Sequence, residues 1–541
     1  MGRQFKPFLL SAVFIAVCAL LSGSLGPGSA AHASSPVSTV GVSGEPELDT
    51  GLKLLTSIYR LAEENAADKV SPDKSIYDGA IPGMLRTLDP HSNFFDPKEF
   101  NKLREDQRGR YYGVGMTISQ HGAGGPTVVV YPFPGSPAFK AGLRPGDIIF
   151  EINDKNALTL TSAEVADLLK GPRGTAVQVK INREGKAEPL VFNLIRDAIN
   201  RPSVPTHFFI RPGIGYIHIE QFNETTSREL DDALSAMNES SLKGLILDLR
   251  DNPGGLLNEG VAVAGRFLKR GQTVVSHRGR TSPVKDYVAS NGSSAREYPI
   301  VVLVSRLSAS AAEIVAGALQ DHDRAWVLGD NTFGKGLVQT VFPLMENTGL
   351  ALTTAKYYTP SGRLIQRDYS KGSFYDYYFH RDTEKKNTQD VKMTDSGRTV
   401  YGGSGITPDE KFTIEYKPFQ LELLRRAAFR EYVPKYFGSH DAKLPKDWSP
   451  DEAMMSDFKA YLVKNTYQFT EADWTQWLDW TRVQLEKEAL LTASGLDEAN
   501  RYSTETDPIV LKALESMPKA KALLDNARKQ MVQLDKRLLR H

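Results

Sequence analysis

A lysine between two glycines stands in the segment GDNTFGKGLVQ, residues 329–339. The spacing Gly329-x-x-x-x-Gly334-Lys335 fits a phosphate-binding loop, in which Ser or Thr comes next and a helix follows. Here Gly336 comes next, and the following LVQTVFPL is typical of a strand. The pattern therefore favours other chemistry for Lys335, with nucleotide binding as a rival interpretation.

Ser310 stands between the apolar segment 300–304 and a largely apolar helical segment that begins near Ala311. With Glu313 three residues later it forms a capping-box pattern, and capping is the ordinary role of such a serine. A serine at a helix N-terminus also lies beside free backbone amides and the positive end of the helix dipole. Because such amides can stabilise the oxyanion of acyl transfer, the position suits a nucleophile if a base can accept its proton.

Lys335 is the base that the spacing favours. The neighbours Asp321 and His322 suggest a Ser-His-Asp triad, but twelve residues of continuous helix would put His322 about 18 Å from Ser310. Lys335 instead follows the next strand, AWVLG, so the chain has returned to the same edge of the sheet. Burial lowers the pKa of a lysine and makes a neutral amine available near pH 7. We therefore expect a Ser-Lys pair, with a surface lysine in a turn as the structural alternative.

The elements around these residues predict a multidomain protein of mixed α/β and α+β class. At 541 residues the chain is too long for one ordinary core. Strands alternate with helices over residues 198–417, which predicts a layered α/β domain with mostly parallel strands. A helical region at 34–108 and a β-rich unit at 109–197 precede this domain, and a helical extension at 418–541 follows it. Since the sites of such sheets lie at strand-to-helix turns, LDLRDNPGGLL is a second candidate segment.

The N-terminus has the features of an export signal. Arg3 and Lys6 precede a mostly apolar run, and Ala-His-Ala at 31–33 resembles a cleavage site. We expect residues 1–33 to be a cleaved signal peptide and the protein to reach the periplasm. The alternative is an uncleaved anchor that holds the protein at the outer face of the inner membrane. The only cysteine, Cys18, lies in this segment, so the mature chain has no thiol nucleophile and no disulfide.

Composition excludes several classes of function. The net charge is +1 without a basic tract, so we expect no nucleic-acid partner. The ten histidines are scattered and form no His-Glu-x-x-His motif, which argues against a zinc enzyme. No metal or organic cofactor is expected.

Residues 109–197 resemble a PDZ domain. The resemblance rests on GVGM (113–116), on PGSPAFKAGLRPGDIIFEIND (134–154) and on a capped helix at 161–170. PDZ domains add a peptide to a sheet edge and hold its terminal carboxylate with backbone amides. The resemblance implies a partner with an apolar protein or peptide C-terminus, held by the loop of Gly113, Val114, Gly115 and Met116. The structural alternative is that these glycines only shape a turn.

The combined motifs resemble the carboxy-terminal processing proteases over residues 47–416. They are SASAAEIVAGALQD, TFGKGLVQ, DLRDNPGG and the PDZ-like unit before them, and the resemblance includes LDPHSNFF, AKYYTPSGRLIQ and GGSGITPD. The separation of 25 residues between Ser310 and Lys335 agrees with the pattern of this family. The resemblance implies a crotonase- or Clp-like α/β core, Ser310 as nucleophile and Lys335 as base. It further implies an orienting role for Gln339, an oxyanion hole from Gly254 or Gly255 with Ala311, and supporting positions at Glu313, Asp321 and Thr332.

We therefore expect an exported serine endopeptidase that recognises protein C-termini and hydrolyses peptide bonds. The alternative is an inactive PDZ adaptor. In the helical extension, Trp474, Trp477 and Trp480 lie on neighbouring faces. Their spacing suggests a contact with a second copy or a regulatory partner, with packing in the extension's own core as the alternative.

Overall fold

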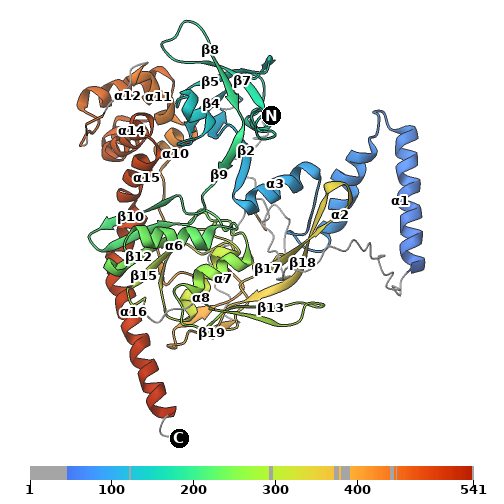
Figure 1. Ribbon diagram of the computed structural model, residues 1–541, viewed down its shortest axis with the longest axis vertical. Helices are drawn as coiled ribbons and strands as arrows, with labels where there is room; N and C mark the ends of the chain where they lie inside the picture. The colour runs from blue at the N-terminus through green and yellow to red at the C-terminus, as the bar shows by residue number, and fades with distance from the viewer. Residues whose placement is uncertain are drawn as a thin grey trace.

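The computed structural model describes residues 45–120, 124–290, 296–370, 377–378, 390–438, 444–445 and 447–538. The expected signal peptide lies outside these residues. Within them, no helix has the length and hydropathy that a membrane span requires. Figure 1 shows a central α/β region, with the β-rich unit and a bundle of helices at one end and the N-terminal helices to one side.

The N-terminal region is mostly helical, as its apolar spacing predicts. The prolines of LDPHSNFFDP separate its helices, and a short strand lies between those prolines. This strand pairs antiparallel with a long strand of the central region, Asn93 opposite Ala351. The elements are α1 (Glu45–Asn65), the π-helix η1 (Lys74–Ala80), α2 (Ile81–Arg86), β1 (Asn93–Phe95) and α3 (Pro97–Arg108).

The β-rich unit has the strands and the capped helix that its sequence predicts. Its sheet is antiparallel in the order β3-β4-β5-β7-β8, with β6 paired to β5, while β2 pairs with β9. The Thr161 hydroxyl accepts from the Glu164 amide, and Glu164 accepts from the Thr161 amide, which confirms the capping box at the start of α5. The elements are β2 (Arg110–Gly113), β3 (Met116–Gln120), β4 (Thr127–Pro132), α4 (Pro137–Ala141), β5 (Ile148–Ile152), β6 (Lys155–Asn156), α5 (Ser162–Leu169), β7 (Ala176–Asn182), β8 (Leu190–Ile195) and β9 (Asp197–Asn200).

A six-stranded sheet forms the centre of the molecule, in the order β10-β11-β12-β15-β16-β21. All neighbours from β11 onward are parallel, which confirms the expected α/β layer, and only β10 runs antiparallel. Continuous apolar runs such as that of β12 and β15 are buried on both faces, as parallel strands require. The strands are β10 (Thr206–Arg211), β11 (Ile214–His218), β12 (Gly244–Asp248), β15 (Ile300–Val304), β16 (Trp326–Gly329) and β21 (Glu410–Lys411).

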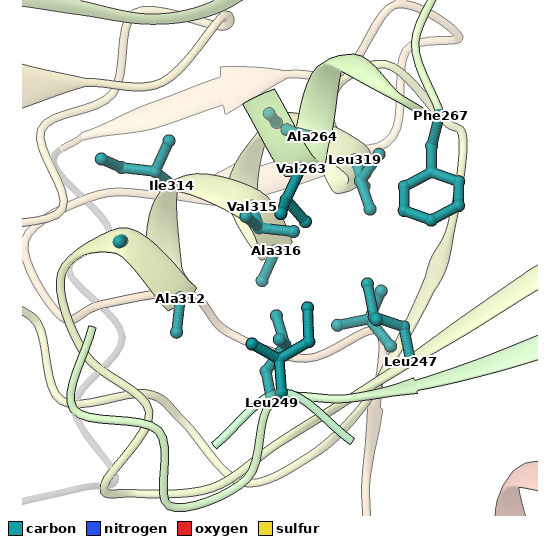
Figure 2. Close-up of a cluster of buried hydrophobic side chains, with 14 of the residues drawn as sticks. Leu247, Leu249, Val263, Ala264, Phe267, Ala312, Ile314, Val315, Ala316 and Leu319 are labelled. Atoms are coloured by element: carbon teal, nitrogen blue, oxygen red, sulfur yellow. The ribbon is translucent and has the colours of Figure 1, made fainter. Parts of the chain in front are cut away.

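Three helices cover one face of this sheet and pack into its largest core: α6 (Thr226–Ala236), α7 (Leu257–Gly265) and α8 (Ala311–Asp321). Figure 2 shows Val315 and Leu319 of α8 in one cluster with Val263 of α7, Leu247 of β12 and Leu249, which follows that strand. Gly260 of α7 lies so close to α8 that a Cβ would be 3.1 Å from the Cβ of Ala311. This packing fixes the N-terminus of α8 against the loop before α7.

The last helix, α16 (Pro508–Leu538), covers the opposite face of the sheet. Val510, Ala513 and Met517 pack against Tyr216 of β11 and Val301 of β15. The sequence placed this segment in the helical extension 418–541, and the structure shows that its last helix packs on the central sheet. Its helical pattern was visible locally, but the sheet face that it covers lies about 200 to 300 residues earlier in the chain.

The remaining C-terminal helices form a bundle beside the β-rich unit. Trp474 is 8% exposed in the core of this bundle, and Trp477 and Trp480 pack against the same core. The three tryptophans therefore stabilise their own bundle. Their spacing no longer supports the expected subunit contact. The helices are α10 (Pro418–Arg425), α11 (Ala428–Phe437), α12 (Glu452–Lys464), α13 (Glu471–Gln476), α14 (Leu478–Ala493) and α15 (Leu496–Glu505).

A second sheet lies beside the central one and contains the strand that follows Lys335. This strand, β17 (Leu337–Pro343), pairs antiparallel with β18. Because a strand and not a helix follows the glycine-rich segment, the structure confirms the sequence argument against a phosphate-binding loop. The other strands of this sheet are β1, β13 (Thr273–Arg278), β14 (Lys285–Val288) and β18 (Gly349–Tyr358). A separate hairpin joins β19 (Val391–Met393) to β20 (Thr399–Tyr401).

Candidate active site

Ser310 lies between the carboxyl end of β15 and the first turn of α8. Its backbone has φ 54° and ψ −114°, a conformation that is strained for a residue with a side chain. The backbone N–H donates to Glu313 Oε2 at 2.9 Å, but the Ser310 hydroxyl makes no capping bond. Ser310 and Glu313 thus have the arrangement of the expected capping box, but the hydroxyl makes no close capping hydrogen bond.

Lys335 is buried, with 5% of its surface exposed. The backbone on both sides of it is packed so that only glycine fits. A Cβ on Gly336 would be 2.6 Å from the backbone nitrogen of Gln366, and Gly334 has φ +85°. The parallel register places Val304, at the end of β15, opposite Gly329, from which this segment departs. The structure therefore brings the lysine segment to the same sheet edge as Ser310, as the sequence predicts.

Glu313 joins these two segments through one fully buried carboxylate. Its Oε2 accepts from the backbone N–H groups of both Ser310, at 2.9 Å, and Lys335, at 2.8 Å. Its Oε1 accepts from the Thr332 hydroxyl at 2.5 Å and from the Gly334 N–H at 2.7 Å. Burial raises the pKa of this carboxyl, and the four donors act in the opposite direction. Glu313 and Thr332 thus hold the candidate nucleophile and base in one unit.

The glycine turn after β12 lies directly against Ser310. A Cβ on Gly254 would be 2.7 Å from the Ser310 Cβ and 2.9 Å from the Ala311 nitrogen. The Gly254 N–H donates to Asn252 Oδ1 at 2.8 Å, so it is already occupied. Among the described residues, the N–H groups of Gly255 and Ala311 donate no hydrogen bond. The geometry therefore favours Gly255, together with Ala311, as the pair of free amides.

Gln339 lies in β17, four residues after Lys335. Lys335 precedes β17, and the register of β17 with β18 shifts between Val338 and Gln339. Because this irregularity interrupts the alternation of side chains, a spacing of four does not by itself put both residues on one face. Gln339 is buried and its Nε2 donates to the Thr353 Oγ1 at 3.1 Å. Its orienting role stays a prediction.

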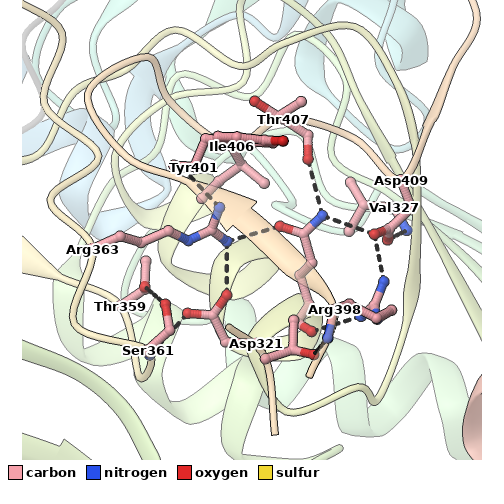
Figure 3. Close-up of polar contacts among 12 residues, drawn as sticks. Asp321, Val327, Thr359, Ser361, Arg363, Arg398, Tyr401, Ile406, Thr407 and Asp409 are labelled. Carbon is pink, nitrogen blue, oxygen red and sulfur yellow. Dashed lines mark hydrogen bonds and ion pairs between the residues drawn. The ribbon is translucent and has the colours of Figure 1, made fainter. Parts of the chain in front are cut away.

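Asp321 lies at the far end of α8 from Ser310 and has a structural partner. Figure 3 shows its carboxylate paired with Arg363 at 2.8 Å, and this arginine is fully buried. The Ser361 N–H donates to the second oxygen at 3.0 Å. His322 bonds Asp395 and the carbonyl of Thr273 instead of approaching Ser310. The helix thus separates Asp321 and His322 from the serine, as its length predicts.

The loop that contains the glycines is also tied to the C-terminal helix. Arg250 forms a bidentate pair with Asp248 and a further ion pair with Asp507 at 2.8 Å. Asp507 in turn accepts from the Ile509 N–H at the start of α16. Sequence reasoning missed this contact, because Asp507 is 257 residues from its partner.

Sequence reasoning also missed a second set of residues at the site. His91, Tyr377 and Gln366 connect by hydrogen bonds, and Gln366 Oε1 accepts from the Gly336 N–H at 2.8 Å. His91 lies in the polar stretch DPHS within an otherwise apolar segment, which was the available signal. Tyr377 carried none, because it is one of several tyrosines in the segment SFYDYYFH.

The loop 113–116 of the β-rich unit has the free amides that a carboxylate needs. The N–H groups of Val114 and Gly115 donate no hydrogen bond within the described chain, whereas the Val114 carbonyl accepts one and the Gly115 carbonyl accepts two. Gly115 has φ +76°, and a Cβ there would collide with the Cβ of Ser136. The glycine therefore shapes the loop, and the free amides stay available.

We expect Gly115→Ala to weaken binding of an apolar C-terminal peptide by about tenfold or more, because the strained and displaced loop moves its amides. Isothermal titration with the full chain measures this. Gly174→Ala is the matched control, since Gly174 has a similar φ of +82° in the same unit but open space around it. Equal affinities of the two variants would contradict a role for this loop.

Comparisons with known proteins agree with this arrangement. Residues 213–373 match peptidase family S41, and residues 128–183 match the PDZ domain. A carboxy-terminal-processing protease of Bartonella bacilliformis is 42% identical over 302 residues, which cover 55% of this chain and 68% of that protein. The carboxy-terminal processing protease CtpA of Bacillus subtilis is 32% identical over 368 residues, covering 68% of this chain and 76% of that protein.

Among solved structures, a photosystem II D1 C-terminal processing protease is 30% identical to this chain. The match covers 69% of this chain and 90% of that one, with a TM-score of 0.36. The sequence identities and the coverage of the relatives establish the relationship. The chain belongs to peptidase family S41, as a PDZ-containing carboxy-terminal processing protease.

Proposed function

We propose that the protein is an exported serine endopeptidase in which Ser310 is the nucleophile and Lys335 the general base. The observation that carries this proposal is the contact of both backbone N–H groups with one oxygen, Glu313 Oε2. A buried acceptor shared by two segments restricts their relative motion, and fixed relative geometry is what proton transfer between side chains requires. Export rests on the signal-like sequence at 1–33.

The chemistry is acyl transfer to serine followed by hydrolysis. The neutral Lys335 amine accepts the Ser310 hydroxyl proton as the oxygen attacks the peptide carbonyl. The free amides of Gly255 and Ala311 stabilise the oxyanion. The lysine then gives its proton to the leaving amine, and a water molecule hydrolyses the ester in the same way. The Ser310 hydroxyl makes no close hydrogen bond that caps α8, so it stays available to donate its proton to Lys335.

The PDZ unit supplies the selection of substrate. Its loop 113–116 would hold the terminal carboxylate of an apolar C-terminus, while the preceding chain reaches the site. An adaptor that binds C-termini without cleaving them is the alternative function, and it needs only this loop.

Cleavage of an unfolded protein with an apolar C-terminus tests the proposal. We expect residues 34–541 to produce fragments that mass spectrometry identifies, and Ser310→Ala to produce none while still binding the C-terminal peptide. Cleavage by the Ser310→Ala variant would contradict the nucleophile. Peptide binding without cleavage by either protein would favour the adaptor. Fractionation of the host cell, with a mature N-terminus near residue 34, tests export.

A further inference from the structure

The turn Asp89–Ser92, between α2 and β1, reaches the lysine segment although it lies more than 240 residues earlier in the chain. Asp89 organises the turn: its Oδ1 accepts from the N–H groups of His91 and Ser92, both at 2.8 Å. Its Oδ2 accepts from the Ser92 hydroxyl at 2.6 Å. All three side chains are buried. The pairing of β1 with β18 places this turn beside the active site.

One chain of hydrogen bonds runs from His91 to the residue after Lys335. The Gly336 N–H donates to Gln366 at 2.8 Å, which identifies the receiving atom as the amide oxygen. The amide nitrogen of Gln366 then donates to the Tyr377 hydroxyl oxygen at 3.2 Å and to the Arg367 carbonyl. Because that oxygen accepts from Gln366, the Tyr377 hydroxyl can donate its own proton to His91 Nε2, 2.9 Å away.

A second chain runs from Ser92 to Gln339. The Thr353 N–H donates to the Ser92 hydroxyl oxygen at 3.1 Å. The Thr353 Oγ1 accepts from the Gln339 amide at 3.1 Å. The two chains therefore end at Gly336 and Gln339, on the same short segment as Lys335, and both begin at the turn that Asp89 organises.

The surroundings of His91 favour a neutral imidazole. Burial, with the cations of Lys335 and Arg367 nearby, lowers the pKa of His91 well below its usual value. Tyr377 and Tyr378 face the ring edge-to-face, and burial raises the pKa of both hydroxyls, so they stay protonated. Asp89 bonds the backbone of the turn. A neutral ring that is protonated at Nδ1 accepts at Nε2, as the bond from Tyr377 requires, whereas a doubly protonated ring would be a donor toward that hydroxyl.

We propose that the turn Asp89–Ser92 belongs to the catalytic apparatus, and that His91 is a positioning residue that holds the Lys335 segment through Tyr377 and Gln366 only while its ring is neutral. This inference rests on the proposed Ser-Lys chemistry. His91 touches neither the substrate nor the transferred proton in this arrangement. It acts by holding the Lys335 segment at a fixed position relative to Ser310.

Steady-state cleavage by four full-length variants tests the inference. We expect His91→Ala and Tyr377→Phe each to lower kcat by about 10- to 100-fold with little change in KM, since small displacements of catalytic groups have effects of this size. The double variant should be no worse than the worse single variant, because both changes break one chain. His91→Gln, which can still accept from Tyr377, should recover most of the activity. Additive losses, or a kcat unchanged in Tyr377→Phe, would overturn the proposal.

The pH profile separates positioning from a merely structural role. In the wild type, log(kcat/KM) plotted against pH should fall as the pH is lowered, first with a slope near one as Lys335 protonates. The slope should approach about two at the lower pH where His91 protonates as well. In His91→Gln the slope should stay at about one. Equal slopes in both proteins would overturn the requirement for a neutral ring.

Acid also lowers the stability of the fold, so the rates must be corrected for the folded fraction. Because the pKa of His91 is lower in the folded than in the unfolded protein, the unfolded chain binds more protons below pH ~6.5. Stability is therefore full above that pH and falls as the pH drops toward the folded pKa. Circular dichroism at each pH measures the folded fraction.

Ser310→Ala and Lys335→Ala belong in the same series. If they abolish cleavage and the His91 and Tyr377 variants do not affect it, only the positioning inference fails. If Ser310→Ala and Lys335→Ala cleave normally, the proposed chemistry itself fails.

Discussion

Lys335→Ala is expected to lower kcat by about a thousandfold or more, the range that a lost general base produces. The Ser310 hydroxyl is a weak nucleophile until its proton has an acceptor, and His322, which bonds Asp395 and the Thr273 carbonyl at the far end of α8, does not replace the lysine. Lys335→Arg should be equally inactive, because a guanidinium does not give up its proton near neutral pH. Affinity for a C-terminal peptide should stay unchanged, since the PDZ loop is separate.

Cleavage assays and peptide titration on the same preparations measure both effects. Ser310→Ala is the reference for complete loss of the covalent pathway. Removing two members of one catalytic unit should cost no more than removing one, so the Ser310→Ala/Lys335→Ala double variant should match Ser310→Ala. Substantial activity of Lys335→Arg would contradict the role of base and point to a purely electrostatic role for the cation.

Glu313→Gln is expected to produce the second largest effect, although Glu313 does not take part in the chemistry. The carboxylate accepts four hydrogen bonds, two at each oxygen. An amide of the same size has only one acceptor oxygen, so its NH2 group would face two donors. Each buried donor that loses its partner costs about 1–3 kcal/mol. We expect a large loss of stability and a fall in kcat of about 100-fold, because the Ser310 and Lys335 segments separate.

Glu488→Gln is the matched control for Glu313→Gln. Glu488 is also a largely buried carboxyl, and burial raises its pKa, but it pairs with Arg430 in the C-terminal bundle. Its replacement should lower thermal stability while leaving the kcat of the folded enzyme unchanged. If both variants lose stability and neither loses kcat, Glu313 serves only folding, and the link that supports the Ser-Lys proposal is lost.

The sequence by itself determined the local elements and predicted the two residues that we propose for the chemistry. The strands around Ser310 and Lys335, the strand after Lys335 and the helix after Ser310 all lie where apolar periodicity and turn residues put them. A parallel sheet collects strand ends at one edge, so residues that follow two neighbouring strands must meet there. These features depend on a few residues close together in the chain, and the sequence displays them directly.

Only the tertiary structure decided which groups complete the site. It distinguished Gly255 from Gly254 through the bond that Asn252 accepts from the Gly254 amide. It also brought the turn of His91 to the Lys335 segment, and packed α16 of the helical extension on the central sheet. Each of these depends on contacts between residues far apart in sequence, for which period and spacing carry no signal. The physical reason is that a buried hydrogen-bond donor or an apolar face must have a partner in the folded protein. The local sequence shows this requirement, but it does not show which distant segment provides the partner.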